Sequence, residues 1–186
     1  MTVGSDFSRT TKPDSLFTMN GKIAADVTTL LVRELEGFKR ELDLFADDES
    51  VWKTMPGVTN SAGNLALHVA GGLQYLIGSV LGGGSYVRDR DAEFGRRSGT
   101  RTELRAEIDR AIAVVRDVLP ALGEPALAAP FPEAVLGVTF RTSTFLLHLC
   151  AHAGLHLGQA GYLRRVLTGD ARSSGPLPLA PLAGAF

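Results

Sequence analysis

The sequence predicts an all-α protein, a four-helix bundle with a long connection between the third and fourth helices. Four segments repeat apolar residues at three- and four-residue spacings, which is typical of helices that bury one face. No internal repeat of solenoid length is present, and 186 residues suffice for one core. We therefore expect a single domain over residues 1–186, with the bundle at about 21–169 and an arm at each end.

The first two helices have recognisable ends. The first is expected from about Gly21 to Phe45, with apolar residues on one face and charged residues on the other. The second follows a turn, begins near Asn60 or Ser61 as N-cap, and ends at the glycines of residues 82–84. Each helix should bury one side.

The third helix has the clearest start, because Thr100 and Glu103 form a capping-box pattern, and Pro120 marks its end. The stretch from Pro120 to Arg141 contains four prolines and is expected to cross from one end of the bundle to another. Within it, residues 135–140 could form a short extended segment, although a lone strand is marginal without a partner.

The fourth helix should start at Thr142 or Ser143 and end at Gly169, and it is apolar nearly all round. A helix with no polar face must be covered on every side. We therefore expect one side to face the bundle core and the other to pack on a second subunit, which makes the protein a homodimer. The tail from Asp170 to Phe186 is expected to be an extended arm that packs on the bundle.

Composition and charge exclude several partners. The formal net charge is −1, so no global positive field attracts nucleic acid or an anionic membrane. One cysteine, Cys150, cannot form an internal disulfide. The first 19 residues are polar, and no run of about 18 apolar residues is apparent. We expect a cytoplasmic protein that binds a small molecule and neither nucleic acid nor membrane.

The four histidines carry the chemistry. His148, His152 and His156 are the strongly polar residues of the apolar segment 145–157, so their ring nitrogens need partners. Residues four apart lie about 6 Å along a helix, so His152 and His156 can reach one ion, whereas His148 and His156 lie about 12 Å apart. The third ligand should come from another helix, and His68 is the remaining histidine.

Other residues near the histidines keep alternative roles. His148 could be a hydrogen-bonded core residue or could support a ligand. Cys150 points away from the expected ion and is interpreted as a core cysteine. Ala153 stands where a helical zinc protease has its catalytic glutamate, which excludes that activity. Tyr75 and Tyr162 are interpreted as packing residues.

The histidine motifs resemble the DinB-like superfamily, also described as DinB and YfiT-like metalloenzymes. The resemblance rests on residues 65–71 (LALHVAG) and 152–159 (HAGLHLGQ), and it extends to residues 60–64 and 88–94. It covers about 21–169. The family has this order of motifs: one histidine in the second helix, and then two histidines four residues apart before Gly-Gln in the fourth helix. The motifs together are more specific for the family than each one alone.

The resemblance implies a four-helix bundle, commonly dimeric, with a mononuclear site of three histidines and water. Carried over residue by residue, the metal ligands are His68, His152 and His156. Members with known activity include thiol S-transferases and a thiol-dependent isomerase, so a low-molecular-weight thiol is an expected cofactor. Zinc is the first choice of metal, with nickel, iron or manganese as alternatives.

The residues around the ligands leave the reaction open. Arg88, Arg90 and Glu93 could line the site and bind an anionic thiol, or could form a solvated charge cluster. Asn64 could bond a ligand imidazole, and Gln159 could hold either a helix partner or a ligand. No dedicated catalytic acid or base is recognisable. The leading hypothesis is therefore a metal-dependent transferase or isomerase, and its rival is a non-catalytic metal-binding or stress-response bundle.

Overall fold

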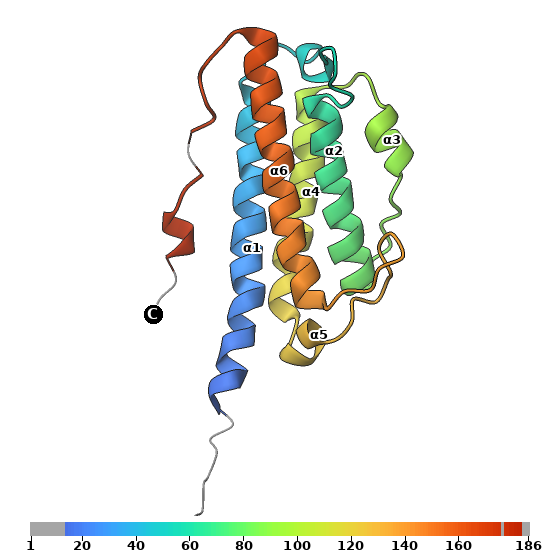
Figure 1. The fold of residues 1–186 in the computed structure, drawn as a ribbon, viewed down its shortest axis with the longest axis vertical. Coiled ribbons are helices and arrows are strands. Elements are labelled where there is room, and N and C mark those ends of the chain that lie inside the picture. The colour runs from blue at the N-terminus through green and yellow to red at the C-terminus, as the bar shows by residue number, and fades with distance from the viewer. Residues whose placement is uncertain (1–13, 176, 184–186) are drawn as a thin grey trace, which may run out of the picture.

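The computed structural model describes residues 14–175 and 177–183, and it confirms the all-α bundle (Figure 1). The four long helices are α1 (Asp14–Asp43), α2 (Ala62–Leu73) with its continuation η2 (Gln74–Leu81), α4 (Arg101–Val118) and α6 (Thr142–Thr168). The shorter elements are η1 (Ser50–Trp52), α3 (Arg90–Gly95), η3 (Leu119–Ala121), α5 (Glu124–Ala128) and η4 (Ala180–Leu182).

The expected helix ends are partly confirmed. Ser61 and Asn64 form a capping box at the start of α2, and Thr100 and Glu103 form another at the start of α4. Helix α1, in contrast, begins at Asp14 and not near Gly21, so part of the expected N-terminal arm is helical. Residues 1–13 of that arm lie outside the described residues.

Helices α1 and α6 run in one direction, and α2 and α4 run in the other (Figure 1). The start of α4 lies beside the end of α1, where Arg101 bonds Asp48 and the carbonyl of Phe45. Because α2 and α4 are parallel, residues 82–100 must return along the bundle, and α3 lies on this return.

The connection between α4 and α6 does not cross the bundle, so that expectation is wrong. Helix α4 ends and α6 begins at the same end, because the two helices are antiparallel (Figure 1). The connection contains η3, α5 and a hairpin over residues 130–141, whose backbone pairs through Phe131 and Phe140. The extended segment expected at residues 135–140 therefore finds its partner within the same loop.

The helical stretch Ala62–Leu81 is long and apolar enough, by length and composition, to span a membrane. The sequence had suggested no apolar run of this kind. Sixty-seven per cent of its apolar window is buried inside the bundle, as in a core helix. Towards its end the hydrogen bonding widens, because the N–H of Gly82 bonds to the carbonyl of Ile77, five residues back.

Helix α6 buries one face and exposes apolar residues on another. Phe145, Leu146 and Leu149 belong to the common core with side chains of α1, α2 and α4. Four apolar side chains are 54–69% exposed on the outer face: Leu147, Leu155, Tyr162 and Val166. No other part of the described chain covers this face, and its burial by a second subunit remains a prediction.

The C-terminal arm runs beside α1. Arg40 of α1 donates to the carbonyl of Ser174, and a Cβ at Gly37 would collide with the side chain of Leu177. The arm thus packs against the bundle, as expected.

Candidate metal centre

Three histidine rings meet between α2 and α6. The Nε2 atom of His152 lies 3.2 Å from Nε2 of His68 and 3.0 Å from Nε2 of His156. Each histidine contributes one ring nitrogen, and these three nitrogens all lie within 4.8 Å of one another. The rings of His68 and His156 are almost perpendicular, at 85°. The sequence prediction that these three imidazoles converge is therefore confirmed.

The outer nitrogens of two rings are held by oxygen atoms. Nδ1 of His156 lies 2.8 Å from Oε1 of Gln159, and Nδ1 of His68 lies 3.1 Å from Oε2 of Glu93. An amide oxygen can only accept, so the contact to Gln159 favours a proton on Nδ1 of His156 and a lone pair on its Nε2. Nδ1 of His68 faces both an acceptor, Glu93, and a donor, Nη2 of Arg88 at 2.9 Å, so these contacts do not select one tautomer. Gln159 thus orients the ring of His156 and does not hold another helix.

Imidazole protons alone cannot satisfy the inner face of the group. Because Nε2 of His156 is bare and Nε2 of His152 carries at most one proton, one of the two contacts that His152 makes lacks a single shared proton in either tautomer of His68. A cation placed among the three nitrogens would satisfy all three lone pairs at once. The geometry and the donor set therefore fit a divalent metal, and this group could hold one.

Glu93 ties α3 to this group from outside. Its carboxylate is buried, and Arg88 donates to both of its oxygens, each at 2.7 Å. A Cβ at Gly71 would collide with Oε1 of Glu93, so the glycine permits the close approach of α3 to α2. Burial opposes ionisation, but hydrogen bonds from His68 and Arg88 hold the pKa of Glu93 below its ordinary value. Glu93 is thus a buried carboxylate and not part of a solvated charge cluster.

Asn64 does not bond a ligand imidazole, so that expectation is wrong. Its side chain accepts from the backbone N–H and the hydroxyl of Ser61, and it donates to the carbonyls of Glu93 and Arg96 at 2.8 and 2.9 Å. The capping box at Ser61 and Asn64 is a sequence signal for this role. Asn64 therefore anchors α3 and positions Glu93 indirectly.

The surroundings of His152 and His156 keep both rings neutral. Burial, together with the neighbouring His156 and His68, lowers the pKa of His152 to about 4. Burial also lowers the pKa of His156, against the hydrogen bond to Gln159. Neutral imidazole is the form that binds metal, so both rings are ready ligands at pH 7.

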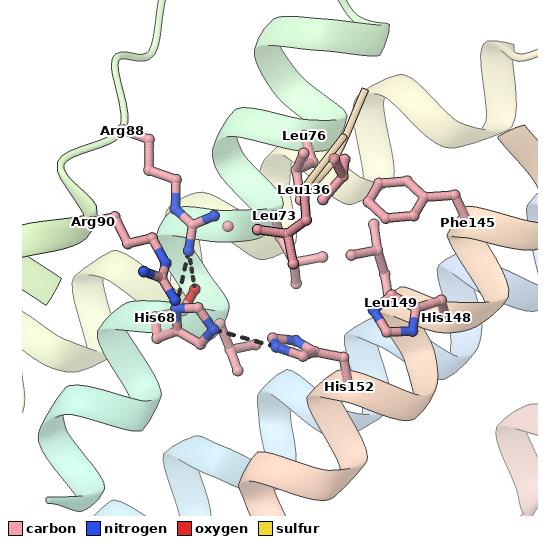
Figure 2. Close-up of a pocket in the computed structure, with 13 residues that line it drawn as sticks. His68, Leu73, Leu76, Arg88, Arg90, Leu136, Phe145, His148, Leu149 and His152 are labelled. Carbon is pink, nitrogen blue, oxygen red and sulfur yellow. Dashed lines mark hydrogen bonds between the residues drawn. The ribbon is translucent and has the colours of Figure 1, made fainter. Parts of the chain in front are cut away.

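A cavity of about 340 Å³ opens beside His68 and His152 (Figure 2). Its wall is mostly apolar, with Arg88, Arg90 and His148 as further polar residues, and it is lined by Val69, Gly72, Leu73, Leu76, Val135, Leu136, Phe145 and Leu149. Arg88 is engaged by Glu93, whereas Arg90 is exposed, with its guanidinium 5.0 Å from the ring centre of Phe94. The two arginines therefore border the site, and Arg90 is the one available to a ligand.

The fourth histidine stands apart from the group. The ring centre of His148 lies 5.9 Å from that of His152, and its ring stacks on Phe145. His148 is exposed and borders the cavity, so its interpretation as a buried core residue is wrong. A small molecule bound in the cavity would therefore lie beside the ring of His148.

The cysteine and the two tyrosines lie elsewhere. Cys150 contacts the carbonyl of Val27 on α1, and burial with nearby Glu34 raises the pKa of its thiol to about 12. Tyr75 donates to Glu133 at 2.6 Å, and Tyr162 is exposed under the guanidinium of Arg165. Cys150 is thus an unreactive interior thiol, whereas Tyr162 is not a buried packing residue.

Comparison with known proteins gives one match. The sequence model described as the DinB superfamily matches residues 30–160, which contain all three histidines of the group. No curated protein and no solved structure matches the chain significantly.

Proposed function

Because this chain belongs to the DinB superfamily, we propose that it is a metal-dependent enzyme whose mononuclear site is held by His68, His152 and His156. One observation carries the proposal: the Nε2 atoms of three histidines converge, and two of these histidines, His68 and His152, line an apolar cavity. No other histidine, cysteine or carboxylate joins this group among the described residues. Three protein ligands with an open side are the arrangement of catalytic metal sites, whereas structural sites are closed by a fourth ligand.

Zinc is the metal we propose first, with nickel, iron or manganese as alternatives that imidazole also suits. A divalent cation held by three neutral ligands would supply Lewis-acid chemistry and would lower the pKa of a water or thiol. The residues of this chain do the rest: Gln159 and Glu93 orient the imidazoles, and the apolar wall excludes water from the reacting groups.

The reaction we propose is transfer of a low-molecular-weight thiol, or isomerisation of its adduct with a small electrophile. Arg90 lies at the cavity and has no ion-pair partner among the described residues, so it can bind an anionic group of such a thiol. Arg88 supports the site by holding Glu93 and is a weaker candidate for this contact.

Elemental analysis tests the metal. Protein purified without an affinity tag should contain about one equivalent of a divalent metal per chain, and the His152→Ala/His156→Ala variant should contain almost none. His148→Ala is the matched control, because this histidine lies on the same helix outside the group. Equal metal content in wild type and double variant would refute the proposal.

Thiol conjugation tests the reaction. Incubation with monochlorobimane and a panel of cellular thiols should show conjugation with at least one thiol, which a chelator abolishes and added metal restores. Absence of metal-dependent conjugation with every thiol, in protein that does contain metal, would favour the rival function of a non-catalytic metal-binding bundle.

We also propose that two chains associate through the outer face of α6. The exposed side chains of Leu147, Leu155 and Val166 form an apolar surface that a second copy would bury. Sedimentation velocity should give a dimer mass for wild type and a lower mass for Leu155→Asp. A monomeric wild type at micromolar concentration would contradict this.

A further inference from the structure

The loop before α6 forms a hairpin over the cavity. Pro130 and Arg141 pair at its base, and near its tip Val135 and Val138 exchange two backbone hydrogen bonds of 3.0 Å each. The Tyr75 hydroxyl, from η2, donates to Glu133 on this loop at 2.6 Å. The tip is therefore held by its own backbone pairs and by a contact to the opposite wall.

The tip residue Leu136 adopts a conformation that leucine disfavours. Its φ is +52°, and it is followed by Gly137 at +77°, as in two-residue hairpin turns that normally contain Asn-Gly. It is the one non-glycine residue with positive φ among the residues the structure describes. A bulky residue is strained in this conformation, because its Cβ approaches the backbone too closely.

Burial does not offset this strain. The Leu136 side chain is 98% exposed, so it gains almost nothing from packing in the protein as it stands. It nevertheless borders the same cavity as His68, His152 and the apolar side chains of Leu76 and Phe145 (Figure 2). A molecule that enters the cavity is therefore what can cover Leu136.

We propose that Leu136 is a specificity residue that contacts the apolar body of the substrate. The inference rests on the proposed function and narrows its substrate class to small molecules with a hydrocarbon or aromatic portion. The reactive group would face the three histidines, and the apolar portion would lie between Leu136 and the wall formed by Leu76 and Phe145.

Two substitutions separate side-chain contact from backbone strain. Leu136→Asn and Leu136→Gly both place a residue that tolerates positive φ at this position, so neither should lower the thermal midpoint of unfolding. Val138→Asn is the matched control, because Val138 lies on the same turn, is 50% exposed and does not border the cavity.

The probes are butanoate and octanoate, which share a carboxylate and differ in chain length, measured by titration calorimetry on the protein as purified. Affinity for wild type should rise by up to about fourfold for each methylene that enters the cavity. The octanoate-to-butanoate affinity ratio should fall severalfold in both Leu136 variants and stay unchanged in Val138→Asn.

An unchanged ratio in the Leu136 variants, or an equal fall in Val138→Asn, would overturn the inference. Metal content is measured on the same samples. Metal-free protein that still shows the Leu136-dependent ratio would contradict the proposed metal function and leave the role of Leu136 standing, so the two failures are distinguishable.

Discussion

Two polar clusters lie on different sides of α6, and they differ in how their hydrogen-bonding groups are satisfied. Towards α1, Arg164 is fully buried, pairs with Glu41, and donates to the carbonyls of Asp170 and Arg172. Towards α2, His68, His152 and His156 turn their Nε2 atoms toward one another, and imidazole protons cannot satisfy both contacts. A polar cluster satisfied by protein groups supports the fold, whereas one left unsatisfied indicates a ligand.

The largest effect on stability is expected from the cluster of Arg164 and Glu41. Arg164→Met leaves Glu41 buried without its partner, so the free energy of unfolding in urea should fall by about 3–5 kcal/mol, with or without metal. The Arg164→Met/Glu41→Met double variant removes both charges and should recover part of the loss. A single variant as stable as wild type would mean that water reaches Glu41.

Metal removal should act on the histidine side alone. If the proposed metal is present at about 1,000 times its dissociation constant, chelation should lower the free energy of unfolding by about 4 kcal/mol. His152→Ala should unfold at the same urea concentration with and without chelator. With chelator present, the free energy of unfolding of His152→Ala should be close to that of wild type, because the substitution also removes a ring nitrogen from the unsatisfied cluster. Equal sensitivity of both proteins to the chelator would contradict the site.

The outer residues should tune metal binding more weakly. Glu93→Gln weakens the contact to Nδ1 of His68 and the pair with Arg88, so metal affinity should fall by about 10- to 100-fold in a competition assay with a chromogenic chelator. Asp91→Asn, an exposed change on the same short helix, should leave the affinity unaltered. A similar loss in both would point to general disturbance of α3.

A separate effect is expected from pH on metal-free protein. The pKa of His152 is about 4 in the folded chain against an ordinary 6.5, because burial and its histidine neighbours disfavour the charged ring. Between these values the unfolded chain binds more protons, so stability should decrease as pH falls from about 6.5 toward 4. Urea midpoints measured across this range should decline, and less so in His152→Ala. A midpoint independent of pH would contradict the lowered pKa.

Much of the fold and of the candidate metal site follows from local sequence patterns. Helical periodicity and the capping boxes at Ser61 and Thr100 predict α2 and α4, since these signals act within a few residues. The four-residue spacing of His152 and His156 places both rings on one face of α6. Their meeting with His68 was a prediction that the packing of α2 on α6 confirms.

The missed features depend on contacts between distant segments. Glu93 belongs to an ordinary charged stretch until Asn64 and Gly71 bring α3 against α2. Arg164 stands beside Arg165 in the sequence, yet Arg164 is fully buried because α1 presents Glu41 and the C-terminal arm presents carbonyls. Helix periodicity does not distinguish these two arginines.

By itself, the sequence determined the helices, the absence of an internal disulfide and the residues that can meet at a metal centre. Only the tertiary structure decided the hydrogen-bond partners of the three histidines, the direction of the connections and the position of Leu136 over the cavity. The physical reason is the sequence distance over which each interaction acts. Helix propensity and capping act between residues that are close in the sequence, whereas hydrogen-bond partners and burial depend on segments that meet only on folding.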